Sequence, residues 1–118
     1  MPFKLGSFNL TNFGPLTIRK TSKFDFAQKT HLIDADKLPS GCVIRTRRDG
    51  DMFTKFGGGA KKLKDYFIDK KIPQRLRSEI PLVCKGNEVY CVIGFEISDK
   101  VKIDETTKQA YILNFKNK

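Results

Sequence analysis

Two β-rich runs separated by a short polar loop constrain the fold of this chain most strongly. The runs are PLVC (81–84) and VYCVIGFEI (89–97), and the loop KGNE between them contains Gly86 and Asn87, which favour tight turns. This pattern predicts a β-hairpin. Because residues 89–93 are apolar on both faces of a strand, we expect a central strand that is covered on each side.

Other segments with a period of two predict further strands. The first forty residues carry such a pattern at Phe8, Leu10, Leu16, Ile18, Phe24 and Phe26. Residues 42–48, CVIRTRR, would place Val43, Arg45 and Arg47 on one basic face, ahead of a tight turn at Asp49 and Gly50. Residues 31–38 fit either a short strand or a helical turn, and AYILNF (110–115) predicts a last strand.

The middle of the chain has a helical pattern. Ala60, Leu63 and Phe67 share one helical face, which predicts a helix over residues 60–71. Pro73 cannot continue that helix but can open a second short turn over QRLRS (74–78). The expected fold class is therefore α+β, with mainly antiparallel strands in a sandwich-like arrangement and an inserted pair of short helices.

Length and composition indicate one domain over residues 1–118, because no linker separates two apolar regions. No apolar run approaches the roughly 20 residues that span a bilayer, and MPFKLGSFNL lacks the features of a signal peptide. We therefore expect a cytoplasmic protein without membrane contact. Cys42, Cys84, Cys91 and His31 lack the spacing of a zinc site, so we expect reduced thiols and no metal.

The charge pattern points to a polyanionic partner. The chain carries a net charge of +10, and residues 41–82 alone hold eleven basic against five acidic side chains. A charge run of this kind is either a solvated surface or a nucleic-acid interface, and its five arginines favour phosphate. With no DNA-recognition motif and no aromatic signature of single-strand readers, double-stranded RNA fits best.

Motifs for catalysis are missing from the sequence. His31 has no nucleophile motif to serve, and GGGAKKL (57–63) lacks the second glycine, lysine and hydroxyl pattern of a nucleotide-binding loop. The same glycines admit two interpretations. They either precede a helix N-terminus that cradles a phosphate together with Lys61 and Lys62, or they form a flexible turn before a solvated lysine face.

The run 44–83 resembles the C-terminal domain of tRNA(Ile)-lysidine synthases. The similar motifs are R-x-R-x-x-G-D (45–51), G-x-x-K-K-L-K-D (58–65), I-P (72–73) and R-x-x-x-P-L (77–82), with weaker likeness at D-A-D-K-L (34–38), Gly94 and T-T-K (106–108). The resemblance is clearest over residues 31–115. Met52, Cys91 and Glu96 depart from residues common in the family, and two of these departures remove possible RNA contacts.

This resemblance implies an RNA-binding, non-catalytic part of an ATP-dependent ligase involved in tRNA modification. Enzymes of the family attach lysine to the wobble cytidine of an isoleucine tRNA, and their N-terminal domain binds ATP and magnesium. For this chain the resemblance implies no cofactor and no catalytic residue of its own. The implied partners are the acceptor stem of tRNA(Ile) and the catalytic N-terminal domain of the same enzyme.

The expected RNA contacts combine the basic segment with the glycine loop. Phosphate or minor-groove contacts are predicted for Arg45, Arg47, Arg48, Lys61, Lys62, Lys64, Arg75 and Arg77, and close approach of the RNA backbone for Gly57, Gly58 and Gly59. An alternative is a module that docks on the catalytic domain or forms a homodimer. That alternative predicts an exposed apolar patch, with Phe53, Phe56 and Tyr66 as candidates.

Overall fold

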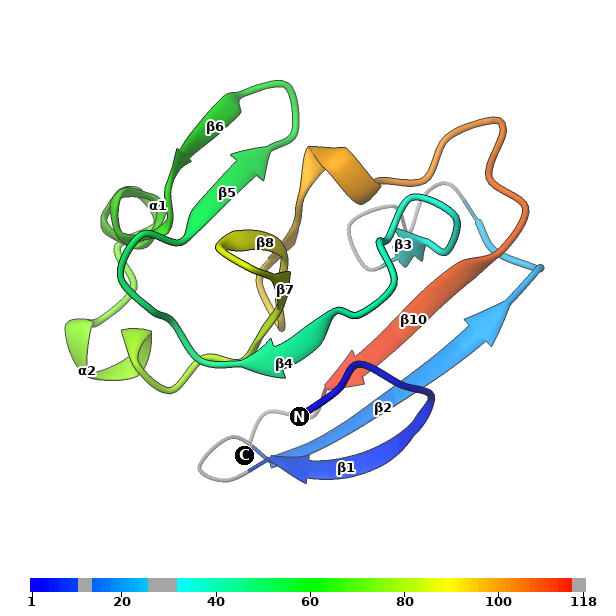
Figure 1. Cartoon of the computed structure of the whole chain (residues 1–118), viewed down its shortest axis with the longest axis horizontal. Helices are drawn as coiled ribbons and strands as arrows, with labels where there is room; N and C mark the ends of the chain where they lie inside the picture. Colours follow the sequence, from blue (N-terminus) through cyan, green and yellow to red (C-terminus); the bar gives the residue numbers. More distant parts are fainter. Residues whose placement is uncertain (11–13, 26–31, 116–118) are drawn as a thin grey trace.

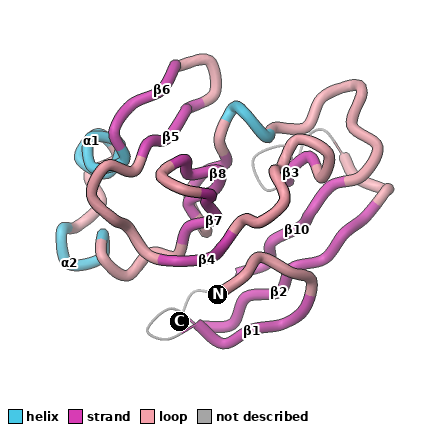
Figure 2. The backbone as a smooth tube through the Cα atoms, viewed as in Figure 1, coloured by secondary structure: helices cyan, strands magenta, loops and turns pink. Residues whose placement is uncertain are grey.

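The computed structural model describes residues 1–10, 14–25 and 32–115, and it contains two β-sheets and a pair of short helices (Figures 1 and 2). The first sheet is antiparallel throughout and has the strand order β1-β2-β10-β3. Its strands are β1 (Gly6–Leu10), β2 (Gly14–Thr21), β10 (Ala110–Phe115) and β3 (Leu32–Asp34).

The second sheet has the order β4-β7-β8-β5-β6, and the short strand β9 also pairs with β8. Its strands are β4 (Val43–Arg45), β5 (Met52–Lys55), β6 (Gly59–Lys62), β7 (Leu82–Lys85), β8 (Glu88–Val92) and β9 (Glu96–Ile97). All pairs are antiparallel except β5 with β8. The helical elements are α1 (Leu63–Asp69), α2 (Gln74–Arg77) and the 3-10 turn η2 (Asp99–Val101).

The apolar residues divide into two main clusters, one on each face of the second sheet. Between the two sheets, Leu16 and Ile18 of β2 pack in one cluster with Val83 of β7. On the other face of the second sheet, Tyr66 and other buried residues of α1 pack against buried sheet residues such as Phe53 of β5. The molecule therefore has three layers, with the second sheet between the first sheet and the helices (Figure 1).

Most of the predicted elements are confirmed. The 82–92 region forms the expected hairpin, and β8 contributes Cys91 to one cluster and Val89 to the other, as a central strand must. Strands also form at 6–10, 14–21 and 110–115, whereas the strand predicted over 42–48 covers only 43–45 and Phe24 lies outside any strand. Within the ambiguous segment, residues 32–38 form a short strand followed by turns, whereas His31 and Phe26 lie outside the described residues.

The predicted helix over 60–71 is wrong at its start. Residues 59–62 instead form β6, whose backbone pairs with β5 from Met52–Lys62 to Lys55–Gly59. The helix begins only at Leu63, whose N–H donates to the Asp51 carbonyl at 2.8 Å. The open edge of β5 offers hydrogen bonds to this segment, and strand pairing therefore overrides the helical periodicity of Ala60, Leu63 and Phe67.

Two segments that are similar to the family's motifs, D-A-D-K-L (34–38) and T-T-K (106–108), contact each other although they are distant in the sequence. The Thr107 hydroxyl donates to the buried Asp34 carboxylate at 2.7 Å, and Lys37 Nζ lies 2.7 Å from Asp104 Oδ2. Asp34 also accepts from the Asp36 amide at 2.8 Å, which fixes the turn after β3. The D-A-D-K-L and T-T-K segments thus maintain the fold.

The three thiols provide a first prediction about stability. Cys42, Cys84 and Cys91 are free and buried, and burial raises the pKa of all three, that of Cys91 to about 12. Because the thiolate is the reactive form, we expect a disulfide reagent at pH 8 to react with the native chain at least about a hundredfold more slowly than with the urea-unfolded chain. Rapid labelling of even one thiol in the native state would contradict this packing.

Candidate nucleic-acid interface

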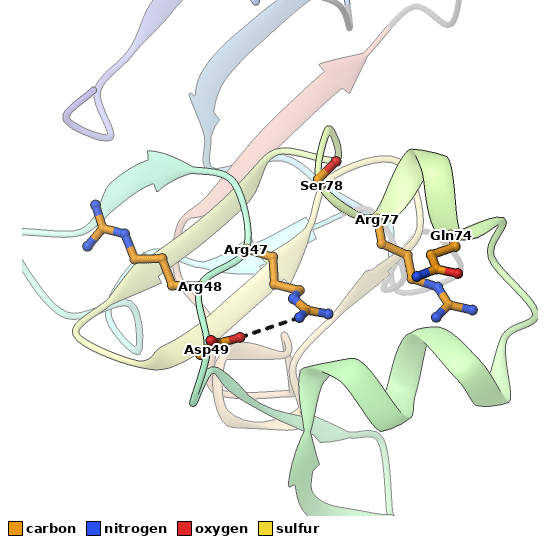
Figure 3. Close-up of a pocket in the computed structure, with 6 residues that line it drawn as sticks. All are labelled: Arg47, Arg48, Asp49, Gln74, Arg77 and Ser78. Atoms are coloured by element: carbon orange, nitrogen blue, oxygen red, sulfur yellow. Dashed lines mark ion pairs between the residues drawn. The ribbon is translucent and has the colours of Figure 1, made fainter.

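An open cleft of about 600 Å³ lies between the loop that follows β4 and the helix α2. The loop contributes Arg47, Arg48 and Asp49, and the α2 segment contributes Gln74, Arg77 and Ser78 (Figure 3). Three arginines and one aspartate are thus among the residues that line the cleft. An opening with a positive charge excess suits a chain of phosphates.

A buried ion pair positions the loop that carries Arg47 and Arg48. The Arg45 guanidinium grips the Asp51 carboxylate with two hydrogen bonds of 2.9 and 2.8 Å, and it also donates to the Gly86 carbonyl at 2.8 Å. Asp51 accepts from the Arg48 amide at 2.8 Å as well. Because the side chains of Arg45 and Asp51 are only 11% and 2% exposed, this pair ties β4, the loop and the β7–β8 turn together from inside.

Arg45 was predicted as an RNA contact, but the structure engages its guanidinium within the protein. Its guanidinium is occupied by Asp51, Gly86 and the Thr46 carbonyl, so its donors face the protein. Burial alone would raise the pKa of the Asp51 carboxyl, but the hydrogen bonds from Arg45 and from the Arg48 amide outweigh it and hold that pKa below its usual value. Arg45 is therefore a structural residue that positions its neighbours.

Arg47 and Arg48 differ in direction. Arg47 Nη2 lies 3.5 Å from Oδ1 of the fully exposed Asp49, on the side of the loop that faces α2 (Figure 3). Arg48 extends away from that pair on the other side of the loop. The two arginines thus cover a wider stretch of surface than one phosphate occupies.

α2 supplies the opposite wall. Arg77 is anchored by its Nε, which donates to the Ile72 carbonyl at 2.9 Å and leaves the end of its guanidinium at the cleft. Gln74 precedes Arg77 by three residues and Ser78 follows it directly. Gln74 and Ser78 are therefore four residues apart, a spacing that in an ideal helix places both on one face. Arg75 is exposed but does not line the cleft, so the structure separates the two arginines of QRLRS.

The lysines are arranged differently from the predicted phosphate cradle. Lys61 lies in β6 and pairs with Asp69, and Lys62 precedes a helix of only seven residues. The Leu63 amide, which the cradle would have offered to phosphate, already donates to Asp51. The cradle at a helix N-terminus is therefore wrong, although Lys62 and Lys64 remain exposed basic side chains near this end of α1.

The three glycines form the turn of the β5–β6 hairpin. Gly57 and Gly59 both adopt a φ of 66°, a conformation that favours glycine, and nothing lies within 4 Å of a Cβ built at either position. The Gly57 amide reaches Asp99 Oδ1 at 3.4 Å. Backbone geometry explains these glycines, and the close approach of RNA to them stays a prediction.

The predicted apolar docking patch is contradicted. Phe53 and Tyr66 are fully buried in the helix-side cluster, where their ring centroids lie 4.8 Å apart. Phe56 is half-buried, and the Lys102 ammonium lies 5.7 Å from its ring centroid. Phe53 and Tyr66 are core residues and Phe56 is a turn residue, so the structure removes the observation on which the docking module depended.

Sequence reasoning missed the neutral and acidic members of the cleft. Gln74 and Ser78 carry no charge and Asp49 fits a tight turn, so the pattern of positive charge does not indicate these residues. The spacing of four between Gln74 and Ser78, which places both on one side of a helical turn next to Arg77, is a signal that could have found them.

Asp49 provides a testable prediction at this site. Its carboxylate competes with phosphate for Arg47, because both anions use the same donors. We therefore expect Asp49→Asn to tighten binding of an RNA duplex roughly threefold at low salt. Fluorescence anisotropy with labelled duplex checks this, and Asp36→Asn, which removes the same charge at an exposed position outside the cleft, is the matched control. Equal tightening in both variants would reduce the effect to net charge.

The described residues contain neither a membrane-spanning helix nor a cluster of metal ligands. Among residues 1–10, 14–25 and 32–115, no helix is both long and apolar enough to span a bilayer. Within the same residues, no group of three histidine, cysteine or carboxylate side chains could hold a metal ion.

The fold and the cleft define a mixed β domain with a basic surface opening, and comparison with known proteins identifies its family. A sequence profile of the TilS substrate C-terminal domain matches residues 42–113, more than half of the chain. The chain belongs to this family. A crystal structure of a TilS C-terminal domain superimposes with a TM-score of 0.79 at 24% sequence identity, covering 95% of this chain and 90% of that one, which confirms the fold.

Curated relatives are tRNA(Ile)-lysidine synthases of bacteria. The relative from Clostridium tetani is 49% identical over 76 residues, which is 64% of this chain and 16% of the relative. Those from Caldanaerobacter subterraneus subsp. tengcongensis and Clostridioides difficile are 37% and 43% identical, over 83% and 81% of this chain and 21% and 20% of their own lengths. The chain thus spans at most about a fifth of these three relatives.

Proposed function

We propose that this chain is the tRNA-binding domain of a tRNA(Ile)-lysidine synthase and that it grips the acceptor stem of the tRNA. In this proposal the remainder of the synthase, which is the domain's covalent partner, attaches lysine to the wobble cytidine. The cleft between the β4–β5 loop and α2 is the observation that carries the proposal, because it brings Arg47, Arg48 and Arg77 to one opening.

The geometry suits an RNA duplex better than a small anion. Arg48 points away from Arg47, and the cleft is open rather than enclosed, so a single phosphate cannot engage all three arginines. Successive phosphates of a stem can engage them, since each guanidinium group donates a pair of hydrogen bonds to one phosphate. Lys62 and Lys64, exposed near the start of α1, would extend this track beyond the cleft.

The glycine-rich segment that the structure describes does not fit an ATP-binding loop. The one glycine-rich candidate, GGGAKKL, forms the β5–β6 turn and strand β6, and Lys61 within it is paired with Asp69. A phosphate-binding loop needs free backbone amides and a free lysine at a helix N-terminus. We therefore assign ATP and magnesium to the part of the synthase that lies outside this chain.

A salt series with two RNA duplexes tests the proposal. The chain is titrated into an acceptor-stem hairpin of an isoleucine tRNA and into a scrambled hairpin of equal length, between about 0.05 and 0.2 M salt. We expect a steep salt dependence, which reflects several released counterions, and tighter binding to the acceptor stem. Equal binding to both duplexes would overturn acceptor-stem recognition, and no binding to either would overturn RNA binding altogether.

A further inference from the structure

We infer that Gln74 and Ser78 bind ribose 2′-hydroxyl groups in the cleft and make it selective for RNA over DNA. The inference rests on the proposed function, because it assumes that a nucleic-acid duplex enters this cleft. It adds recognition of the ribose 2′-hydroxyl group, which the positively charged side chains of the cleft cannot supply.

The placement of the two residues supports this role. Both line the cleft, and both side chains are exposed (Figure 3). Gln74 begins α2 and Ser78 follows its last residue, Arg77, which also lines the cleft. Within the described part of the chain, neither side chain makes a hydrogen bond, so both keep their full hydrogen-bonding capacity for a ligand.

The chemistry of the other lining residues leaves the discrimination to these two. Arg47, Arg48 and Arg77 only donate hydrogen bonds, and the phosphates they suit are the same in RNA and DNA. Asp49 is already engaged by Arg47. A 2′-hydroxyl both donates and accepts, and the side chains that also do both in this cleft are the amide of Gln74 and the hydroxyl of Ser78.

The backbone around Gln74 and Ser78 gives them a fixed position. Arg77 Nε donates to the Ile72 carbonyl at 2.9 Å, and the Leu76 amide donates to the Pro73 carbonyl at 2.9 Å. Leu76 packs against the helix-side apolar cluster and holds the α2 turn in place, while Gln74 and Ser78 line the cleft. Such an anchored turn can hold two neutral groups at constant spacing beside a minor groove.

The test compares an acceptor-stem RNA hairpin with a DNA hairpin of the same sequence. Binding of both is measured for the unmodified chain, for Gln74→Ala/Ser78→Ala, and for Ser40→Ala/Gln109→Ala. The last variant removes the same two exposed side-chain types outside the cleft. We expect the cleft variant to bind RNA about tenfold more weakly, while its DNA binding and its salt slope stay unchanged. The control variant should keep the unmodified ratio.

Outcomes of this experiment separate the inference from the proposed function. If the unmodified chain binds the RNA hairpin with a steep salt dependence but Gln74→Ala/Ser78→Ala leaves the RNA-to-DNA ratio intact, the role of the two residues is wrong and the proposed function stands. If the unmodified chain does not bind the RNA hairpin, the proposed function itself fails. Circular dichroism of the variant confirms that α2 still packs as in the unmodified chain.

Discussion

Arg45→Ala is expected to lower the free energy of unfolding by about 3 kcal/mol, the largest effect of any single change outside the apolar core. The substitution leaves the carboxylate of Asp51, whose side chain is 2% exposed, without its two charged hydrogen bonds. It also frees the Gly86 carbonyl in the β7–β8 turn. Thermal unfolding followed by circular dichroism should show a fall in Tm of at least about 10 °C.

Arg48→Ala is the matched control for this prediction. The Arg48 side chain is exposed, and only its backbone amide, which alanine keeps, contacts Asp51. Its unfolding free energy should therefore stay within about 0.5 kcal/mol of the unmodified chain. Arg45→Lys keeps the charge but loses the two-pronged grip, so an intermediate loss is expected. Equal stability of Arg45→Ala and Arg48→Ala would show that the buried pair does not maintain the fold.

The same ion pair gives the fold a defined acid sensitivity. The folded state holds the pKa of Asp51 below its usual value of 3.8. The stabilisation is therefore complete above that value and is lost as pH falls through the lower pKa of the folded state. We expect the stability difference between the unmodified chain and Asp51→Asn to shrink as pH is lowered from about 6 to about 2.5 in urea titrations. A constant difference would contradict the assignment.

Arg47→Ala/Arg77→Ala is expected to weaken binding of the acceptor-stem hairpin by about a hundredfold. Each arginine faces the cleft, and a charged hydrogen bond to phosphate contributes about 1.4 kcal/mol, or tenfold, per residue. The salt slope should also become shallower by about two, because two fewer counterions are released. Filter binding or anisotropy across the salt series measures both quantities.

A variant with the same loss of charge elsewhere controls for electrostatics at a distance. Arg19→Ala/Lys23→Ala removes two exposed cations from β2 and the segment after it, in the first sheet and away from the cleft. We expect less than a threefold loss of affinity for this variant, since screening weakens charges farther than about 10 Å from the RNA. A comparable loss in both double variants would mean that the whole surface, rather than the cleft, attracts RNA.

Local patterns in the sequence predicted the sheet elements well. The polar loop at 85–88 and the apolar residues on both sides of it predicted the hairpin and its central position, because turn chemistry and alternation act over a few residues. The helical turn at 74–77 followed from Pro73 in the same way. These elements depend on neighbours in the chain, so their sequence carries enough information.

The rest depended on contacts between distant residues. Residues 59–62 became a strand because β5 offered them an open edge, which no local period reveals. Arg45 resembles Arg47 in sequence, yet its guanidinium is engaged inside the protein because Asp51 of the β4–β5 loop and Gly86 of the β7–β8 turn meet it. Composition could indicate that the middle segment is basic, but only the tertiary structure separates the arginine that maintains the fold from those that face the cleft.

Mapping the RNA-binding surface by nuclear magnetic resonance tests the central claim most directly. The ¹⁵N-labelled chain is titrated with the acceptor-stem hairpin, and the amide signals are followed residue by residue. The largest shifts should fall on residues 47–49 and 74–78, with smaller ones near Lys62 and Lys64 and almost none in β1 and β2. Shifts concentrated in the first sheet, with the cleft unchanged, would contradict the assignment of this cleft as the RNA interface.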